Sequence, residues 1–197
     1  FSPDGLGHSR VLDELIPAMR CALQAQFGFP FPGIRILGNE TDMPASTALI
    51  LIDEIPELMV TMGPQDVLVL APVERLVALR IAAQVWPDPQ SGGQWSGIAL
   101  ADRDAAVAAG LACMDAAEYI VNVLQRVVQR QAVCFLNIDV VCCLVAELAP
   151  TDTELVASTV PSRLSWVDLT AVLRGLVEED VGIGDLRAIL GALAQSE

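Results

Sequence analysis

The side chains that could do chemistry in this sequence are few, and their spacing does not favour catalysis. The five cysteines are Cys21, Cys113, Cys134, Cys142 and Cys143. An odd number without a CxxC pair fits neither a disulfide framework nor a zinc site. A cysteine nucleophile also needs a base, and the one histidine, His8, lies in a glycine-rich start. We therefore interpret the cysteines as small buried side chains in a reducing compartment.

The acidic and glycine-rich motifs also favour structural roles. Asp53–Glu54 and Glu178–Glu179 are adjacent pairs, so at least one carboxylate of each faces water, unlike a glycosidase pair. The Gly182-x-Gly184 motif follows a predicted helix and lacks the third glycine and the lysine of nucleotide-binding loops. The sequence therefore predicts no catalytic residue, no metal ligand and no cofactor. An enzyme that uses Cys134 or the carboxylates is kept as an alternative.

The composition narrows the classes of partner. Of the 197 residues, 53% are hydrophobic, and 25 acidic residues against 11 basic ones give a net charge of −14. All the basic residues are arginines. This hydrophobicity excludes intrinsic disorder, and the acidity argues against binding to nucleic acid. No apolar run reaches the roughly 20 residues of a membrane-spanning helix. The charge would instead attract basic partners, with a strength that falls as salt rises.

The first two thirds of the chain mix helical and strand patterns. Helical spacing, an Ala-rich run and Gly, Pro and Asn breakers predict helices over 9–27, 73–81 and 102–109. Short apolar runs predict strands over 34–37, 48–55, 58–62, 67–71 and 111–114. Pro56 is expected to end the second of these strands. Trp86 and Trp95 flank a polar loop, predicted over 87–97, that could form an interaction site.

From Asp115 onward every predicted element is a helix. Asp115 is expected to cap a long helix, and helices over 137–149 and 153–159 follow. Ser165 and Asp168 form a capping-box pattern before another helix, and the last helix follows Gly184. The change of composition near Asp115 is the best domain boundary. The sequence thus predicts an α+β fold with an all-helical C-terminal part.

Several motifs, in the same order along the chain, resemble the cytoplasmic domain of the type III secretion export-gate family, which injectisomes and flagella share. They are Phe27-Gly-Phe-Pro-Phe-Pro-Gly-Ile-Arg-Ile36, Ala71-Pro-Val-Glu-Arg-Leu76, Asp88-Pro-x-x-Gly92 with Trp95, Asp115-Ala-Ala-Glu-Tyr-Ile120, Phe135-Leu-Asn-Ile-Asp139, Val160-Pro161, Leu169-x-x-Val-Leu-Arg-x-Leu-Val-Glu-Glu-Asp-Val-x-Ile183 and Asp185-Leu-Arg-x-Ile-Leu190. The turn after Phe31 and the Ile55-Pro56 pair resemble the injectisome branch more than the flagellar one.

The resemblance implies a three-part fold. Residues 1–56 and 99–114 would form a first α/β subdomain, with a small second subdomain inserted at 57–98. Residues 115–197 would form a helical third subdomain that builds a ring. A fourth subdomain normally follows in this family, and transmembrane helices precede the domain, so the chain is expected to be a piece of a membrane-embedded parent protein.

The function that the resemblance implies is assembly and docking. Family members form a ring, typically of nine subunits, on the cytoplasmic face of the bacterial inner membrane. The ring is expected to receive chaperone–substrate complexes, a gatekeeper protein and the stalk of the export ATPase. The residues that match the chaperone-docking element are Asp88, Pro89, Gly92 and Trp95, and Ser91 stands where flagellar members carry an aromatic residue. A free-standing acidic adaptor or chaperone is the main alternative from the residues alone.

Overall fold

The computed structural model describes residues 9–38, 42–44, 46–63, 65–86 and 95–195 of the chain. Contacts within the chain define two compact units. The first consists of Phe1–Leu15 and Leu37–Leu124, and the second of Ile16–Ile36 and Gln125–Glu197. The expected α+β class is confirmed, because the first unit carries the sheets and the second is helical. The three-part division at residues 57, 99 and 115 stays a prediction.

A two-stranded hairpin opens the sheet-containing unit. Strands β1 (Thr47–Ile52) and β2 (Ile55–Thr61) pair antiparallel. The two turn residues, Asp53 and Glu54, both have positive φ, at 49° and 68°, as a tight turn that matches the strand twist requires. Pro56 does not end a strand as expected. It lies inside β2, close to a bulge at Ile50/Leu51, where a missing N–H is tolerated.

The second sheet of this unit has four strands in the order β4-β5-β3-β6, and all neighbouring strands are antiparallel. The strands are β3 (Asp66–Val69), β4 (Ala83–Trp86), β5 (Trp95–Ala99) and β6 (Cys113–Met114). Helix α2 (Val73–Ala78) follows β3, and a 3₁₀ turn (Leu100–Asp102) leads from β5 into α3 (Arg103–Ala108).

In the core of this sheet, alternate strand residues pack together with residues of α2 and α3. The buried cluster contains Val67, Val69, Ala71, Leu76, Ile81, Ile98, Ala106 and Leu111. Val67 and Ile98 are cross-strand partners, so their side chains share one face of the sheet. Leu76 from α2 and Ala106 from α3 belong to the same cluster. The helices therefore cover one face of the sheet with apolar residues.

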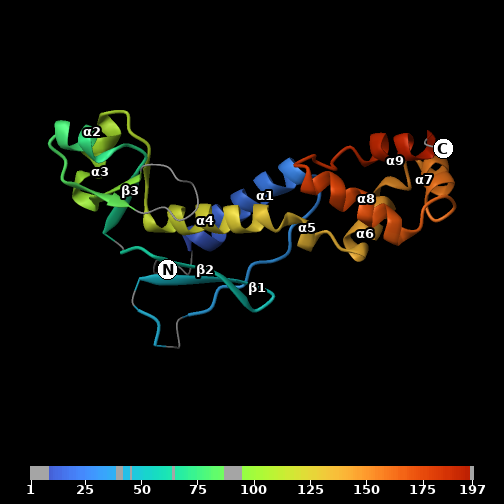
Figure 1. Cartoon of the computed structure of the whole chain (residues 1–197), viewed down its shortest axis with the longest axis horizontal. Helices are drawn as coiled ribbons and strands as arrows, with labels where there is room; N and C mark the ends of the chain where they lie inside the picture. The colour runs from blue at the N-terminus through green and yellow to red at the C-terminus, as the bar shows by residue number, and fades with distance from the viewer. Residues whose placement is uncertain (1–8, 39–41, 45, 64, 87–94, 196–197) are drawn as a thin grey trace. The chain divides into compact units, whose positions relative to one another are not determined.

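Helices make up the second unit. They are α1 (Ile16–Phe27), α5 (Ala132–Phe135), α6 (Ile138–Leu148), α7 (Thr153–Thr159), α8 (Trp166–Glu178) and α9 (Leu186–Gln195). Helix α4 (Ala116–Arg130) begins in the first unit and ends in the second. Figure 1 shows α6, α7, α8 and α9 gathered beside one another. A π-helical turn (Val11–Leu15) precedes α1.

The predicted helix starts are confirmed by cap hydrogen bonds. Asn137 Oδ1 accepts from the Val140 amide at 3.0 Å at the start of α6. Ser165 Oγ accepts from the Asp168 amide at 3.1 Å and donates to the Asp168 carboxylate at 2.6 Å. The bonds from the Val140 and Asp168 amides each satisfy a first-turn donor that has no partner inside its helix.

An aromatic cluster packs beside the helices of the second unit. The rings of Phe29 and Phe31 are stacked with centroids 4.8 Å apart, and Phe31 meets Phe135 edge-on at 5.8 Å. Phe29 is completely buried. Arg20 Nη2 donates to the Phe31 carbonyl at 2.8 Å, which fixes the turn after α1. These aromatic rings therefore belong to the core of the helical unit.

Some predicted elements were wrong. Residues 34–37 form no strand, and the backbone there is irregular. The helix expected over 9–27 is divided into the π-helical turn and α1, and Pro17 lies where the one passes directly into the other. Strands β4 and β5 were not predicted, and residues 95–97, which were expected in the loop over 87–97, belong to β5. Within the described ranges, the helices are too short or too polar for any of them to span a bilayer.

Candidate functional site

Four residues are predicted to dock partners, and the structure describes one of them, Trp95. Asp88, Pro89 and Gly92 lie outside the described residues, as does Ser91. Trp95 is the first residue of β5 and pairs directly with Trp86, the last residue of β4. Its side chain is half-buried. The two tryptophans that were expected at the loop edges are therefore cross-strand neighbours.

Glycine and tryptophan share one face of this sheet. Side chains alternate along a strand, so Trp95 and Gly97 lie on the face opposite Ser96. A Cβ on Gly97 would lie 2.9 Å from Cε3 of Trp86, so the missing side chain leaves room for the indole. On the other face, Ser96 Oγ donates to the Ala71 carbonyl at 2.7 Å. The sheet thus places the half-buried Trp86 and Trp95 side chains on one face.

The cysteines do not assemble a reactive centre. All five, each in the described part of the chain, are free thiols. Cys21, Cys134 and Cys143 are exposed, so the expectation that the cysteines are buried is wrong for these three. Burial raises the pKa of the Cys113 thiol, against a smaller lowering effect of Arg103. In the ranges that the structure describes, no group of three His, Cys, Asp or Glu side chains could hold a metal ion.

A charged cluster joins the start of the chain to the start of α4. The amides and carboxylates of Asp115 and Glu118 bond reciprocally, with both N···O distances at 2.9 Å. Their other oxygens accept from Arg10, at 2.5 Å to Asp115 Oδ2 and through a further bond to Glu118 Oε1. Asp115 and Glu118 therefore cap the start of α4 and also bind the guanidinium group of Arg10.

Electrostatics reinforce this cluster. Burial of the Asp115 carboxyl tends to raise its pKa, but hydrogen bonds from the Glu118 amide and from Arg10 outweigh burial, and the pKa is lowered. Hydrogen bonds to Asp115 and Glu118 raise the pKa of Arg10. The sequence predicted the Asp115 cap, and its Asp-x-x-Glu spacing signals the reciprocal bond. The role of Arg10 has no such signal, because 105 residues separate it from Asp115.

A backbone contact in the helical unit explains the Gly182-x-Gly184 motif. The Ile183 amide donates to the Phe27 carbonyl at 2.8 Å. A Cβ on Gly182 would lie 2.6 Å from the Gln26 carbonyl oxygen, and a Cβ on Gly28 would overlap the backbone of Gly184. The motif lies between α8 and α9 and lets this connection touch the end of α1. It has a packing role.

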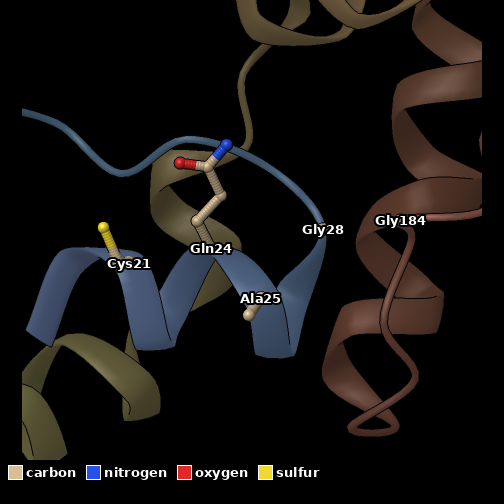
Figure 2. Close-up of a pocket in the computed structure, with 5 residues that line it drawn as sticks. All are labelled: Cys21, Gln24, Ala25, Gly28 and Gly184. Carbon is tan, nitrogen blue, oxygen red and sulfur yellow. The ribbon is translucent and has the colours of Figure 1, made fainter. Parts of the chain in front are cut away.

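A shallow, open depression lies beside this contact. Cys21, Gln24 and Ala25 from α1 line it together with Gly28 and Gly184. Figure 2 shows the Cys21 and Gln24 side chains projecting from the same side of α1, with Gly28 facing Gly184; both side chains are exposed. The surface is too open to enclose a small molecule, unlike the concave pockets that bind ligands.

Comparisons with known proteins cover the whole fold. The chain is 25% identical to the CdsV protein of Chlamydia pneumoniae, with a TM-score of 0.86 over 100% of this chain and 59% of that chain. A structure of the Chlamydia pneumoniae CdsV and CdsO complex gives 25% identity and a TM-score of 0.86 over 98% of this chain and 56% of that chain. This chain therefore spans between half and two thirds of those relatives.

Another solved structure and a family profile also match this chain. Nonameric EPEC SctV-C, at 20% identity, matches the fold with a TM-score of 0.70 over 95% of this chain and 56% of that chain. A comparison with curated protein sequences found no match. The FHIPEP family profile matches residues 6–197. The chain therefore belongs to the FHIPEP family, and it has the fold of the cytoplasmic domain of type III secretion export-gate proteins.

Proposed function

We propose that this chain forms part of the cytoplasmic ring of a type III export gate and docks the proteins that the gate receives. The single observation that carries the proposal is the match of the whole chain to CdsV, at a TM-score of 0.86. The nonameric state of EPEC SctV-C supports a ring of nine subunits. The ring would lie on the cytoplasmic face of the bacterial inner membrane, below membrane-spanning segments of the parent protein.

Partner docking is the second part of the proposal. CdsV has been solved together with CdsO, which supports a protein-binding role for this fold. The partners we propose are chaperone–substrate complexes, a gatekeeper protein and the stalk of the export ATPase, and no catalytic role is proposed. Their candidate site contains Asp88, Pro89, Gly92 and Trp95. The aromatic sheet face of Trp95 and Trp86 supplies rigid apolar area of the kind that anchors protein interfaces.

The proposed ring uses the three-part division. Residues 115–197 would provide the subunit interface, while residues 1–56 with 99–114 and the insertion 57–98 would provide the docking surfaces. The helical unit supports this assignment because it has its own buried core, which includes Leu169, Leu173 and Leu190. A rigid helical body suits repeated contacts around a ring.

Ring formation is tested by mass photometry and negative-stain imaging of the chain over a range of concentrations. We expect rings to appear as concentration rises, because ring closure is driven by mass action. A chain that stays monomeric at every concentration, while circular dichroism shows intact helices, would contradict the ring.

Docking is tested with the secretion chaperones of the same bacterium. Trp95→Ala should weaken chaperone binding in calorimetry by about thirtyfold or more, because a buried interfacial tryptophan contributes at least about 2 kcal/mol. Trp166→Ala, at the start of α8, is the matched control and should bind normally. Equal binding by both variants, with unchanged thermal unfolding, would remove Trp95 from the site.

A further inference from the structure

The β1–β2 hairpin has one buried face and one apolar face that nothing in the described chain covers. Ile50 and Val60 point to one side and are buried. On the other side, Leu51 is 50% exposed and Met59 is 61% exposed. Leu49 is also exposed and lies directly opposite Met59 across the two strands. Because side chains alternate along a strand, these residues form one continuous surface.

This surface extends along the hairpin to Leu51, whose cross-strand partner is Pro56. We call the side chains of Leu49, Leu51 and Met59 the outer hairpin face. An isolated two-stranded ribbon is only marginally stable in water. An apolar contact on this face would therefore stabilise the hairpin. A cluster of exposed aliphatic side chains at this spacing marks an interaction surface.

The charges around the outer hairpin face are all of one sign along the chain. Asp53 and Glu54 form the turn, and Glu57 stands at the bulge opposite Ile50/Leu51. All three are exposed. The sequence contains no Arg, Lys or His between Arg35 and Arg75. An apolar surface with an acidic rim is complementary to a partner with apolar side chains and a basic rim.

The same charges indicate which classes of partner can bind the outer hairpin face. Phosphate-rich surfaces, such as nucleic acid or an anionic membrane, are repelled by an acidic rim. A second copy of this hairpin would bring the same three carboxylates against the first. Pro56 lacks an N–H, so the edge of β2 is a poor template for an added strand. The face itself, rather than the strand edge, is the complementary surface.

We propose that the outer hairpin face binds an amphipathic helix of a partner protein whose apolar side is flanked by arginine or lysine. Paired strands are about 4.8 Å apart, so the face is wide enough for one row of helix side chains. Leu49 and Met59 contact the centre of the helix, and Glu57 with the turn carboxylates pairs with its basic flank. This inference rests on the proposed docking role and adds a surface separate from the Trp95 element.

Methionine methyl signals provide a direct test. The probe is a synthetic amphipathic peptide with leucines on one side and arginines on the other, added to the full chain labelled with ¹³C at the methionine methyls. Met59 should shift strongly. Met62, one residue beyond β2 but only 3% exposed, and Met19, which is buried in α1, should not. A peptide with glutamates in place of the arginines is the control and should leave Met59 unchanged.

Variants localise the binding. Met59→Ser and Leu51→Ser should each weaken peptide binding by about tenfold, as expected for the loss of one buried apolar side chain. Val77→Ser, at an equally exposed position on α2, is the matched control and should bind like the parent chain. Glu54→Gln combined with Glu57→Gln should weaken binding at low salt and remove most of its salt dependence.

Several results would overturn the inference. They are an unshifted Met59, an equal response to the glutamate peptide, a Met59 shift caused by anionic vesicles, and a Met59 shift caused by concentrating the chain alone. Ring formation is measured on the same variants. Intact rings without peptide binding would overturn this surface and leave the ring standing, whereas peptide binding without rings would do the reverse.

Discussion

Helices α8 and α9 of the helical unit bury large leucine side chains in its core, whereas the β1–β2 hairpin of the other unit exposes several large aliphatic side chains on one face. Leu173 and Leu190 are completely inaccessible to solvent in α8 and α9. Leu51 and Met59 are at least half exposed on the hairpin. Both regions have a high content of hydrophobic residues, so composition alone does not distinguish a core from a contact surface. Whether a side chain joins the core or the contact surface depends on which face of its helix or strand it lies on.

This difference separates residues that hold the fold from residues that are free to bind. At the buried positions of the helical unit, substitutions should change the free energy of unfolding. On the outer hairpin face, substitutions should change binding and leave stability nearly intact.

Gly28→Ala should have the largest effect. Gly28 has a φ of +85°, and its new Cβ would overlap the Gly184 backbone. Left-handed strain and a backbone overlap together should cost about 4 kcal/mol of unfolding free energy. Urea titration followed by circular dichroism would show it. Gly175→Ala is the control: it lies inside α8, where a Cβ meets nothing within 4 Å, and should stabilise the helix by about 0.5 to 1 kcal/mol.

Leu173→Ala should be next. Leu173 is fully buried in α8, and leucine-to-alanine changes in a core cost about 2 to 5 kcal/mol. Its neighbour Val172 is 36% exposed, so Val172→Ala should cost much less. Hydrogen exchange measured by mass spectrometry should show faster exchange in the helical unit and unchanged exchange in β3 and β5. Uniform acceleration over both units would show that they unfold as one body.

These two positions also show what sequence can predict. Leu169, Leu173 and Leu176 repeat at helical spacing, so the periodic pattern places α8 correctly, and Ser165 marks its start. The contact of Gly28 with Gly184 joins segments far apart in the chain. No local pattern encodes such an approach, and the Gly-x-Gly motif indicated only a turn.

The sheet-containing unit was harder to predict for a related reason. Strand β4 has four residues, Ala83–Trp86, too few for an alternating pattern to stand out. Residues 34–37 are apolar enough for a strand but find no partner strand in the described structure. Of the candidate docking residues, the family resemblance located Trp95, but its pairing with Trp86 follows from strand register alone.

Removing the cap of α8 should have an intermediate effect on the free energy of unfolding. Ser165→Ala deletes the acceptor for the Asp168 amide at the start of α8, and should lower the unfolding free energy by about 1 kcal/mol. Ser162→Ala is a fair control, because its hydroxyl donates only to the Ala157 carbonyl in an exposed turn. Differential scanning calorimetry would compare the two midpoints. Equal shifts for both variants would mean that the cap contributes nothing beyond a surface hydroxyl.

Asp115→Asn tests the charged cluster in the sheet-containing unit. The lowered pKa of Asp115 means that its ionised form stabilises the folded chain above the ordinary value of 3.8 and that this contribution is lost as pH falls below it. The asparagine still caps α4 but loses the charge that faces Arg10. The variant should be less stable than the parent at pH 7 by at most about 1 kcal/mol, because Arg10 is half exposed.

The decisive measurement for Asp115 is the difference in stability as a function of pH. The gap between the parent chain and the variant should close as pH falls below the ordinary carboxyl value of 3.8 and through the lowered pKa of Asp115 in the folded chain. It should also shrink at high salt. A gap that stays constant across this pH range would show that the Asp115 charge does not contribute to stability.

The outer hairpin face should give the smallest effect of all. Met59→Thr keeps a residue that favours strands at a position already 61% exposed, and should change the unfolding free energy by no more than about 0.5 kcal/mol. The adjacent Val60 is 6% exposed, so Val60→Ala should cost about 1 to 2 kcal/mol. Two neighbours on one strand would then report opposite faces of the hairpin. A large loss of stability in Met59→Thr would mean that this side chain supports the fold after all, and the separation between core and contact surface would fail where it is most sharply drawn.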